Sequence, residues 1–137
     1  MKNEIILNTE SDTIKWAAGF AKTLCVPKTV ALHGTLGMGK SVIARAIIQT
    51  LCGSDTVVPS PTFTLVQTYD ADDIRISHFD LYRINDVSEL EEIGLSHAIV
   101  NDITIIEWPE IATRMLPTDT IHVFIVQHGD GRKITIG

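Results

Sequence analysis

A glycine-rich stretch in the first third of the chain constrains the fold more than any other feature. Residues 34–41 read GTLGMGKS and match the pattern G-x-x-x-x-G-K-[ST] at every fixed position. Glycine reaches positive φ angles without steric cost, so such a loop curls tightly and its backbone N–H groups form a concave anion site. The pattern predicts that Lys40 reaches the β- and γ-phosphates of a nucleotide and that the Ser41 hydroxyl ligates Mg²⁺.

The segments on either side of this loop argue against a chance glycine-rich turn. A phosphate-binding loop follows a strand and opens a helix. Residues 29–33 form a short, mostly apolar run, and residues 42–51 have helical composition and period. We therefore expect a nucleotide-binding loop between a strand and a helix.

The length and composition are those of an ordinary globular domain. The chain has 137 residues, of which 45% are hydrophobic and 20% charged. This length suits one domain, residues 1–137, and not two. The apolar runs are shorter than the roughly 18 residues that indicate a membrane span, and the start lacks the basic and then apolar pattern of a signal peptide. We expect a cytoplasmic protein that does not enter a membrane.

The charge argues against direct binding of nucleic acid. The net charge is −6, and the 11 lysines and arginines are scattered along the chain, whereas a protein that grips phosphates along a nucleic acid needs a basic stripe. Any action on RNA is therefore expected to pass through a partner.

The cysteines and histidines do not suggest a structural metal site. Cys25 and Cys52 are isolated in mostly apolar segments, which favours buried thiols. The five histidines show no ligand spacing. We expect no structural zinc.

The hydrophobic pattern predicts alternating strands and helices. Residues 4–8 are expected at a sheet edge, and residues 12–24 as a helix that buries Ile14 and Ala17 on one face. Ser88 and Glu91 have the spacing of a capping box, and Gly94 is a possible break in the helix that follows. Strands are expected at residues 4–8, 29–33, 62–69, 74–82, 103–106, 121–127 and 132–136, and helices at residues 12–24, 42–51, 88–99 and 111–115.

The order of these segments predicts an α/β fold. We expect a P-loop NTPase-like domain whose central sheet is mixed but mostly parallel, flanked by helices and bordered by antiparallel edge strands. Residues 62–69 and 74–82 read as a β-hairpin. The β-branched run at residues 103–106 is typical of a strand buried on both faces, and residues 121–127 are expected to be a further buried strand.

Two acidic residues follow predicted strands, where a Mg²⁺–nucleotide site needs a carboxylate. Glu107 ends the buried run at residues 103–106, and Asp80 lies near the end of the second hairpin strand. The carboxyl ends of strands are the usual ligand edge of an α/β sheet. The alternative for each residue is a solvated carboxylate.

Other polar and aromatic positions leave alternatives open. Thr62 lies where a loop sensing the γ-phosphate would be placed, but the pattern alone favours a loop hydroxyl bonded to nearby backbone. Trp108 could be exposed to a partner, although tryptophan is usually largely buried. His33 is expected to be a packing residue. Arg132 and Lys133 could reach a base or ribose, or they could simply lie exposed at a turn.

Four segments together resemble one protein family. They are the loop at residues 34–41, the run SPTFTLV at residues 60–66, the run HFDLYR at residues 78–83 and the run EWPE at residues 107–110. In their order and separations they resemble the TsaE (YjeE) family, small P-loop ATPases that take part in making threonylcarbamoyladenosine in tRNA. The resemblance covers nearly the whole chain.

The resemblance implies a slow, Mg²⁺-dependent accessory ATPase that docks on the TsaB–TsaD complex and is stimulated by it. Lys40, Asp80 and Glu107 would be catalytic, and Ser41, Glu107 and Asp80 would serve the metal. Asp80 would assist the metal or the attacking water. The residues implied to hold ATP or ADP are Glu10, Gly34, Thr35, Leu36, Gly37, Met38, Gly39, Lys40, Ser41, Thr62 and Arg132.

The loop departs from the family pattern, which usually reads GDLGAGKT, at three positions. Thr35 replaces aspartate and Met38 replaces alanine, while Ser41 keeps the hydroxyl of threonine. Because backbone N–H groups do most of the phosphate binding, ATP binding is expected to survive. The rate of hydrolysis is left open by the loss of a carboxylate at position 35.

Two other functions fit the same loop. A small P-loop kinase needs an acceptor pocket and an arginine-bearing lid, whereas the five arginines here are dispersed and no segment is spare for a lid. A nucleotide-sensing adaptor with little hydrolysis would use the same residues as a slow ATPase, and the sequence separates the two poorly.

Overall fold

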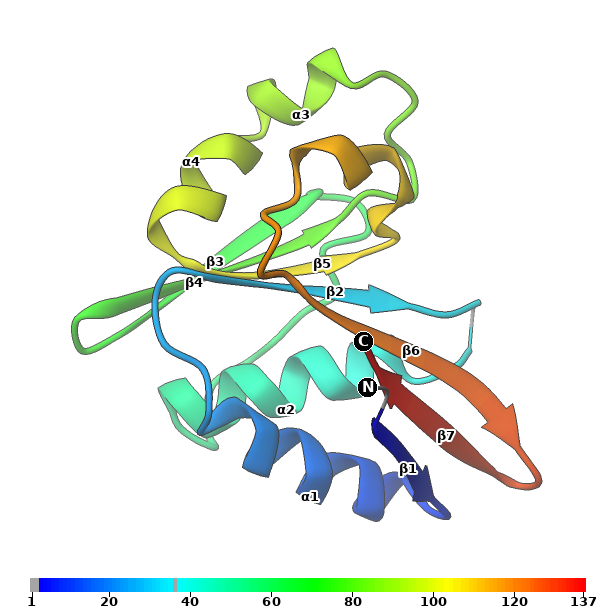
Figure 1. Ribbon diagram of the computed structural model, residues 1–137. Coiled ribbons are helices and arrows are strands. Elements are labelled where there is room, and N and C mark those ends of the chain that lie inside the picture. The colour runs from blue at the N-terminus through cyan, green and yellow to red at the C-terminus, as the bar shows by residue number, and fades with distance from the viewer. Residues whose placement is uncertain (1–2, 36) are drawn as a thin grey trace.

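One continuous sheet organises the computed structural model, which describes residues 3–35 and 37–137. Its seven strands lie in the order β1-β7-β6-β2-β5-β4-β3 (Figure 1). The central strands β6, β2, β5 and β4 are parallel, and the outer pairs are antiparallel. This confirms the predicted fold class and the edge position of the first strand. The strands are β1 Asn3–Leu7, β2 Lys28–His33, β3 Val66–Ala71, β4 Ile74–Asp80, β5 Ile103–Glu107, β6 Ile121–His128 and β7 Gly131–Ile136.

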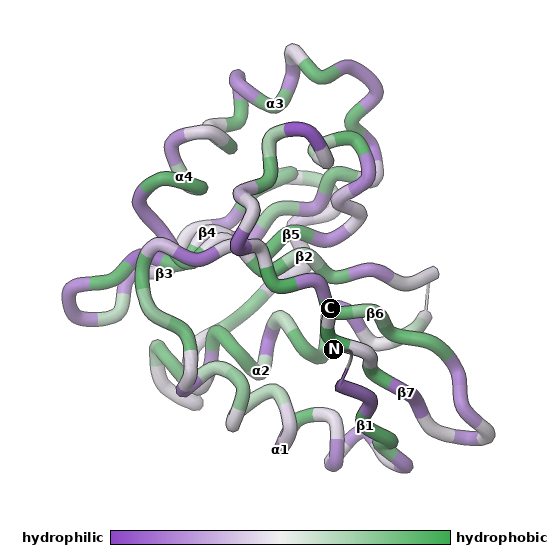
Figure 2. The backbone as a smooth tube through the Cα atoms, in the orientation of Figure 1, coloured by the Kyte–Doolittle hydropathy of each residue, from purple (hydrophilic) through white to green (hydrophobic). Residues whose placement is uncertain are grey.

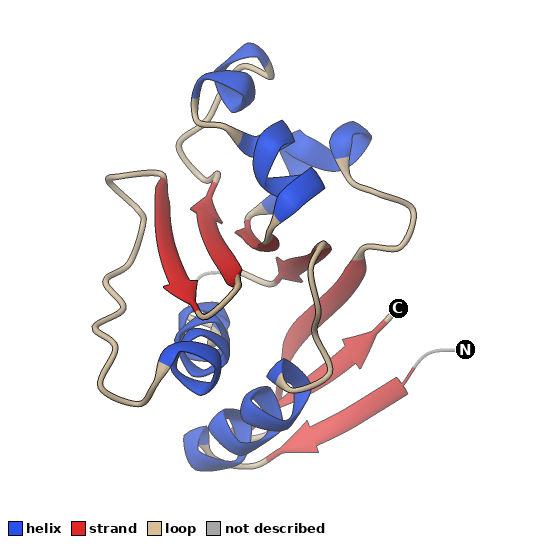
Figure 3. Ribbon diagram, turned by 90° about the vertical axis from the view of Figure 1, so that its left-hand side faces the viewer, coloured by secondary structure: helices blue, strands red, loops and turns tan. Residues whose placement is uncertain are grey.

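Helices cover the two faces of the sheet unequally. Helices α1 (Glu10–Ala21) and α2 (Lys40–Cys52) pack side by side beneath it, and the shorter α3 (Ser88–Glu92), α4 (Leu95–Asn101) and the 3-10 helix η1 (Pro109–Met115) lie on the other face (Figures 1 and 3). The second group lies over the β3–β5 side of the sheet, and the described residues place no helix over β6, β7 and β1 on that face. No helix of residues 3–35 and 37–137 is long and apolar enough to cross a membrane.

Strand β5 contributes side chains to two hydrophobic clusters, one on each face of the sheet. Figure 2 shows the hydropathy of each residue along the backbone. Because successive side chains point to opposite faces, Ile105 packs toward α2 with Ile43, while Ile106 packs toward α3 and α4 with Phe79. All five positions of β5 are buried, as its β-branched run predicted.

Strand β6 is less buried than expected, because one of its faces has no helix over it. Val123 and Ile125 are buried, but Phe124 and Val126 between and after them are 41% and 47% exposed. The prediction of a buried strand at residues 121–127 is therefore wrong for one face.

Helix α1 begins and ends earlier than the hydrophobic pattern predicted. The Thr9 hydroxyl accepts a hydrogen bond from the Asp12 backbone N–H at 3.1 Å, so the helix starts at Glu10. It ends at Ala21, and its buried positions are Thr13, Ala17 and Ala21. The prediction that Ile14 is buried is wrong, since Ile14 is 43% exposed.

The predicted start of β3 at Thr62 is also wrong. The Leu65 N–H donates to the Pro61 carbonyl at 2.6 Å, and Leu65 has a positive φ of 71°. Residues 62–65 therefore form a turn, and the strand begins at Val66. The hairpin with β4 is confirmed.

Local polar contacts account for the remaining differences. The predicted capping box is wrong, because the backbone N–H and the hydroxyl of Ser88 both donate to the Asp86 carboxylate at 2.9 Å. Gly94, at φ 83°, does separate α3 from α4. Cys25 is exposed and Cys52 is half-buried, so the expectation of two buried thiols is wrong.

Candidate functional site

The phosphate-binding loop joins the end of β2 to the start of α2, as predicted. Gly37 and Gly39 have φ angles of 80° and 99°, which side chains rarely adopt. Gly39 is the N-cap residue of α2 and has no side chain that could cap the helix. The N–H groups of the first turn are therefore available to an anion, which the helix dipole also favours. Leu36 lies outside the described residues.

Lys40 is folded inward at the mouth of this loop. Its Nζ donates to the carbonyl of Gly34 and lies 3.3 Å from the centre of the Trp108 ring. Only 5% of Lys40 is exposed, and burial lowers the pKa of its amino group, although Glu107, Glu110 and Asp80 act in the opposite direction. The acidic residues and the aromatic face around Lys40 favour its charged form, against the effect of burial.

Trp108 forms a wall of the site and is not a core residue. Its φ of 55° is unusual for a residue other than glycine, and it forms the N-cap position of η1. The half-buried ring meets Tyr82 at a centroid distance of 4.8 Å and covers Lys40. Such backbone conformations cluster at functional sites, and here it brings the indole over the lysine.

The two predicted acidic residues lie side by side. Asp80 ends β4 and Glu107 ends β5, and the register of these parallel strands pairs the two residues directly. They are 6% and 3% exposed. Because paired residues on adjacent strands project to the same face, both carboxylates lie on the α2 side of the sheet, beside the phosphate-binding loop.

Each oxygen of Glu107 has its own partner. The Ser41 hydroxyl donates to Oε1 at 3.4 Å, and Nε2 of His78 lies 2.6 Å from Oε2. Ser41 comes from the first turn of α2 and His78 from β4. The Glu107 carboxylate therefore joins the loop to the neighbouring strand.

Asp80 is held by the segment that was predicted to sense a nucleotide. The Thr62 hydroxyl donates to Oδ2 of Asp80 at 3.1 Å, and the Tyr82 backbone N–H donates to Oδ1 at 3.0 Å. The Ser60 hydroxyl lies 2.7 Å from the Thr62 hydroxyl. Thr62 is therefore not a loop hydroxyl satisfied only by nearby backbone.

Two adjoining cavities bring the predicted residues together. A cavity of about 370 Å³ is lined by Glu10, Gly37, Gly39, Lys40, Ser41, Val42, Thr62, Asp80, Glu107, Trp108 and Arg132. The second, of about 240 Å³, shares four of these residues, Glu10, Gly39, Val42 and Arg132, and reaches β1 and β7 through Leu7, Asn8, Thr9, Thr13, Met38, Asp130 and Gly131. Gly34, Thr35 and Met38 line a third hollow on the β6 side of the loop.

Arg132 contacts the loop itself. Its Nε and Nη2 donate to the carbonyls of Met38 and Gly37 at 3.2 and 3.1 Å. The neighbouring Lys133 instead forms an ion pair with Glu4 at 3.3 Å. Of these two adjacent cations, only Arg132 lines the cavities among the described residues.

Comparison with known proteins identifies the family. Residues 7–134 match the family model described as threonylcarbamoyl adenosine biosynthesis protein TsaE. The chain belongs to the TsaE family. It is 40% identical over 134 residues to the tRNA threonylcarbamoyladenosine biosynthesis protein TsaE of Rickettsia bellii, covering 98% of this chain and 93% of that protein. It is 37% identical to the Aquifex aeolicus TsaE, covering 97% and 94%.

A solved structure supports the fold. The crystal structure of YdiB from Bacillus subtilis superposes with a TM-score of 0.79 at 21% identity, covering 99% of this chain and 84% of that one. The fold of this TsaE-family chain therefore matches that of a solved structure over nearly the whole chain.

The donors of this TsaE-family site fit Mg²⁺. Ser41, Thr62, Asp80 and Glu107 supply oxygen atoms, which Mg²⁺ prefers. Among residues 3–35 and 37–137, no three histidine, cysteine or acidic side chains gather as a complete metal cage. Mg²⁺ characteristically uses one or two carboxylates together with substrate phosphates and water, so the arrangement suits a metal that arrives with a nucleotide.

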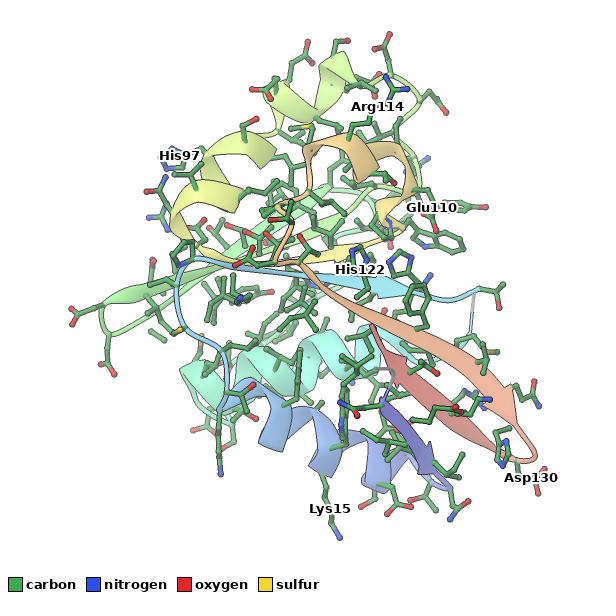
Figure 4. The ribbon with its side chains drawn as sticks, viewed as in Figure 1. Lys15, His97, Glu110, Arg114, His122 and Asp130 are labelled. Atoms are coloured by element: carbon green, nitrogen blue, oxygen red, sulfur yellow. The ribbon has the colours of Figure 1, made fainter. Side chains whose placement is uncertain are left out.

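Sequence reasoning missed two histidine contacts in this TsaE-family chain. His78 contacts Glu107, a pairing that the alternation of β4 could have indicated, because His78 precedes Asp80 by two residues on one face. His33 packs as expected, stacked on Phe124, but its Nε2 also lies 2.9 Å from Nδ1 of His122. His122 lies on the sheet face toward η1 (Figure 4).

Proposed function

We propose that this chain binds ATP with Mg²⁺ and hydrolyses it slowly, in support of threonylcarbamoyladenosine formation in tRNA. We further propose that it does so on the TsaB–TsaD complex, which raises the hydrolysis rate. The observation that carries the proposal is the convergence of Lys40, Ser41, Asp80 and Glu107 on one cavity beside the glycine-rich loop. Membership of the family supports the pathway, and we expect this activity in the cytoplasm.

The loop and the two cavities divide the nucleotide between them. The N–H groups at the start of α2 and the Lys40 ammonium would hold the phosphates in the larger cavity. The smaller cavity, between β1, β7 and the loop, would take the base and ribose beside Glu10 and Arg132. Because Lys40 is bound to the Gly34 carbonyl and the Trp108 ring, it must turn outward when phosphates enter.

The acidic residues would serve the metal and the water. Mg²⁺ supplies the positive charge that neutralises the phosphate oxygens as the bond breaks. Ser41 and Glu107, already in contact, would hold it. Asp80 faces the same cavity with Thr62 bound to one of its oxygens. It would assist the metal or orient the attacking water.

The inward position of Lys40 also favours low activity in isolation, and so keeps a nucleotide-sensing adaptor as the second candidate. In an adaptor, ATP binding would change contacts with the partner and hydrolysis would contribute little. The two candidates differ in one measurable property. The partner complex should raise the rate of phosphate release by an ATPase, but not that by an adaptor.

Phosphate release, measured with and without TsaB–TsaD, tests the proposal. We expect slow Mg²⁺-dependent release from the chain alone and a clear increase with the complex. Lys40→Ala should weaken ATP binding, since the lysine carries the charge proposed to face the phosphates. Glu107→Ala should weaken the Mg²⁺ dependence and partly retain nucleotide binding.

Three results would contradict it. One is an unchanged rate of phosphate release in the presence of TsaB–TsaD, together with undiminished binding of Lys40→Ala to that complex. This result would mean that ATP hydrolysis has no role in the complex. An unchanged metal requirement in Glu107→Ala would remove Glu107 from the site. Transfer of phosphate to a small acceptor would identify a kinase.

The negative charge supports a complex in which the partner, and not this chain, holds the tRNA. At −6, the chain would repel a polyanion in the absence of a basic stripe. We therefore expect no strong binding of tRNA by the chain alone.

A further inference from the structure

His78 is a buried polar residue that the proposed function does not yet use. It lies in β4 with 2% of its surface exposed. It precedes Asp80 by two residues, so both side chains project from the same face of the strand, toward α2. A buried imidazole needs a polar partner to offset the loss of water, and the identity of that partner is informative.

The partner of His78 is the Glu107 carboxylate. Nε2 lies 2.6 Å from Oε2 of Glu107, while Ser41 donates to the other oxygen. An ionised carboxylate only accepts hydrogen bonds, so Nε2 carries the hydrogen. The other ring nitrogen, Nδ1, is buried without a hydrogen-bond partner among the described residues. The polar contact of the ring is thus directed to Glu107.

This contact limits how Glu107 can turn. Rotation of the carboxylate away from His78 would leave a buried N–H group without a partner, which is unfavourable because no water replaces the lost hydrogen bond. The Ser41 contact is longer and comes from the loop at the start of α2. When Ser41 turns to a metal, His78 is the contact that keeps the carboxylate in place.

We propose that His78 is a positioning residue that holds the Glu107 carboxylate in the orientation in which Glu107 serves Mg²⁺. The inference rests on the proposed Mg²⁺–ATP function. Residues behind metal ligands commonly act in this way, and their loss costs about 10–100-fold in metal affinity or activity.

A purely structural role for His78 would be to join β4 to β5. These strands are already paired in register from residue 76 to residue 80, and Phe79 and Ile106 pack together on the opposite face. A structural role predicts a loss of stability alone. A positioning role predicts a change in the Mg²⁺ dependence of nucleotide binding.

Two polar replacements of similar size separate these roles. The amide nitrogen of glutamine can occupy the place of Nε2 and donate to Glu107, whereas the shorter side chain of asparagine reaches only the place of Nδ1. Both variants therefore carry a polar amide, but only His78→Gln keeps the hydrogen bond to Glu107. His78→Leu removes all polar contact.

Ser77→Ala provides the matched control. Ser77 is adjacent on β4 and equally buried, but it projects to the opposite face, where its hydroxyl donates to Asp102 at 2.7 Å. Its removal breaks a buried polar contact of the same strand away from the nucleotide site. Urea unfolding of every variant reports the cost to the fold.

The affinity for ATP is measured by calorimetry on the full chain in EDTA and across a Mg²⁺ series. We expect similar ATP affinity for all variants in EDTA. His78→Asn should require about tenfold more Mg²⁺ to gain half of the metal-dependent affinity, and His78→Gln should recover most of this loss. Ser77→Ala should lower stability without moving the Mg²⁺ midpoint.

Several outcomes would overturn the inference. One is an Asn variant with the wild-type Mg²⁺ midpoint, and another is a Ser77→Ala midpoint that moves as far. Equal losses of ATP affinity in EDTA and in Mg²⁺ would show that His78 acts on the loop and not on the metal. A wild-type chain whose ATP affinity ignores Mg²⁺ would instead refute the proposed function.

Discussion

Arg132 offers a test of what shapes the phosphate-binding loop. Its guanidinium donates to the carbonyls of Gly37 and Met38 from β7, a strand on the far side of the smaller cavity. Gly37 is one of the positions with positive φ. We predict that Arg132→Met weakens ATP binding, because the loop samples other conformations once these contacts are lost, and only the bound conformation takes phosphate.

The geometry sets the size of this effect. A hydrogen bond from a charged donor contributes about 1.5–3 kcal/mol when buried. Arg132 is half-buried and its contact with Gly37 is exposed, so the two loop contacts together should contribute about 1–2 kcal/mol. This corresponds to a loss of about 5–30-fold in ATP affinity.

Calorimetric titration with ATP measures the loss, and Arg132→Lys separates a loop contact from a direct phosphate contact. Lysine is a point charge that could still attract a phosphate but lacks the rigid fork with which arginine donates to two carbonyls. We therefore expect the lysine variant to bind as weakly as the methionine variant. Lys133→Met, which removes a neighbouring cation paired with Glu4, is the control and should bind normally. Wild-type ATP affinity in Arg132→Lys would show that Arg132 does not act by holding the two carbonyls of the loop.

Two further predictions follow from neighbouring contacts. In Trp16→Phe, which leaves Trp108 as the single tryptophan of the two in the chain, ATP should change the fluorescence as Lys40 leaves its place 3.3 Å from the ring centre; an ATP-bound chain with unchanged emission would contradict this movement. Burial, His122 and Lys40 lower the pKa of His33 below 6.5, against an opposing effect of Glu110. The folded chain then binds fewer protons than the unfolded chain as pH falls through 6.5, so its stability should drop there. His33→Gln should therefore flatten the pH dependence of stability measured by urea unfolding. An unaltered pH dependence would show that His33 is not its cause.

The sequence predicted the parts of the site that depend on backbone direction. The loop at residues 34–41 needs a strand before it and a helix after it, and both are present as β2 and α2. Asp80 and Glu107 follow β-rich runs, and parallel strands bring their carboxyl ends to one edge. Such arguments require only the order of the elements and their direction.

The parts that were missed depend on contacts between distant residues. The turn at residues 62–65 is closed by the Leu65 N–H and the Pro61 carbonyl. Its Thr62 also contacts Asp80, 18 positions away, which the alternation of side chains at residues 62–69 cannot report. His78 meets Glu107 across 29 positions. Each is decided by tertiary packing that overrides a local pattern.

The altered loop sequence of this chain leaves the acidic part of the site intact. Thr35 is exposed and lies on the β6 side of the loop, outside the cavity that holds Asp80 and Glu107. Those carboxylates come from β4 and β5 and keep their own partners, whatever residue stands at position 35. Since backbone N–H groups do most of the phosphate binding in loops of this kind, the replacement of the usual aspartate removes one charge near the loop and leaves the proposed metal-binding residues in place. ATP binding and its Mg²⁺ dependence should therefore persist in this chain.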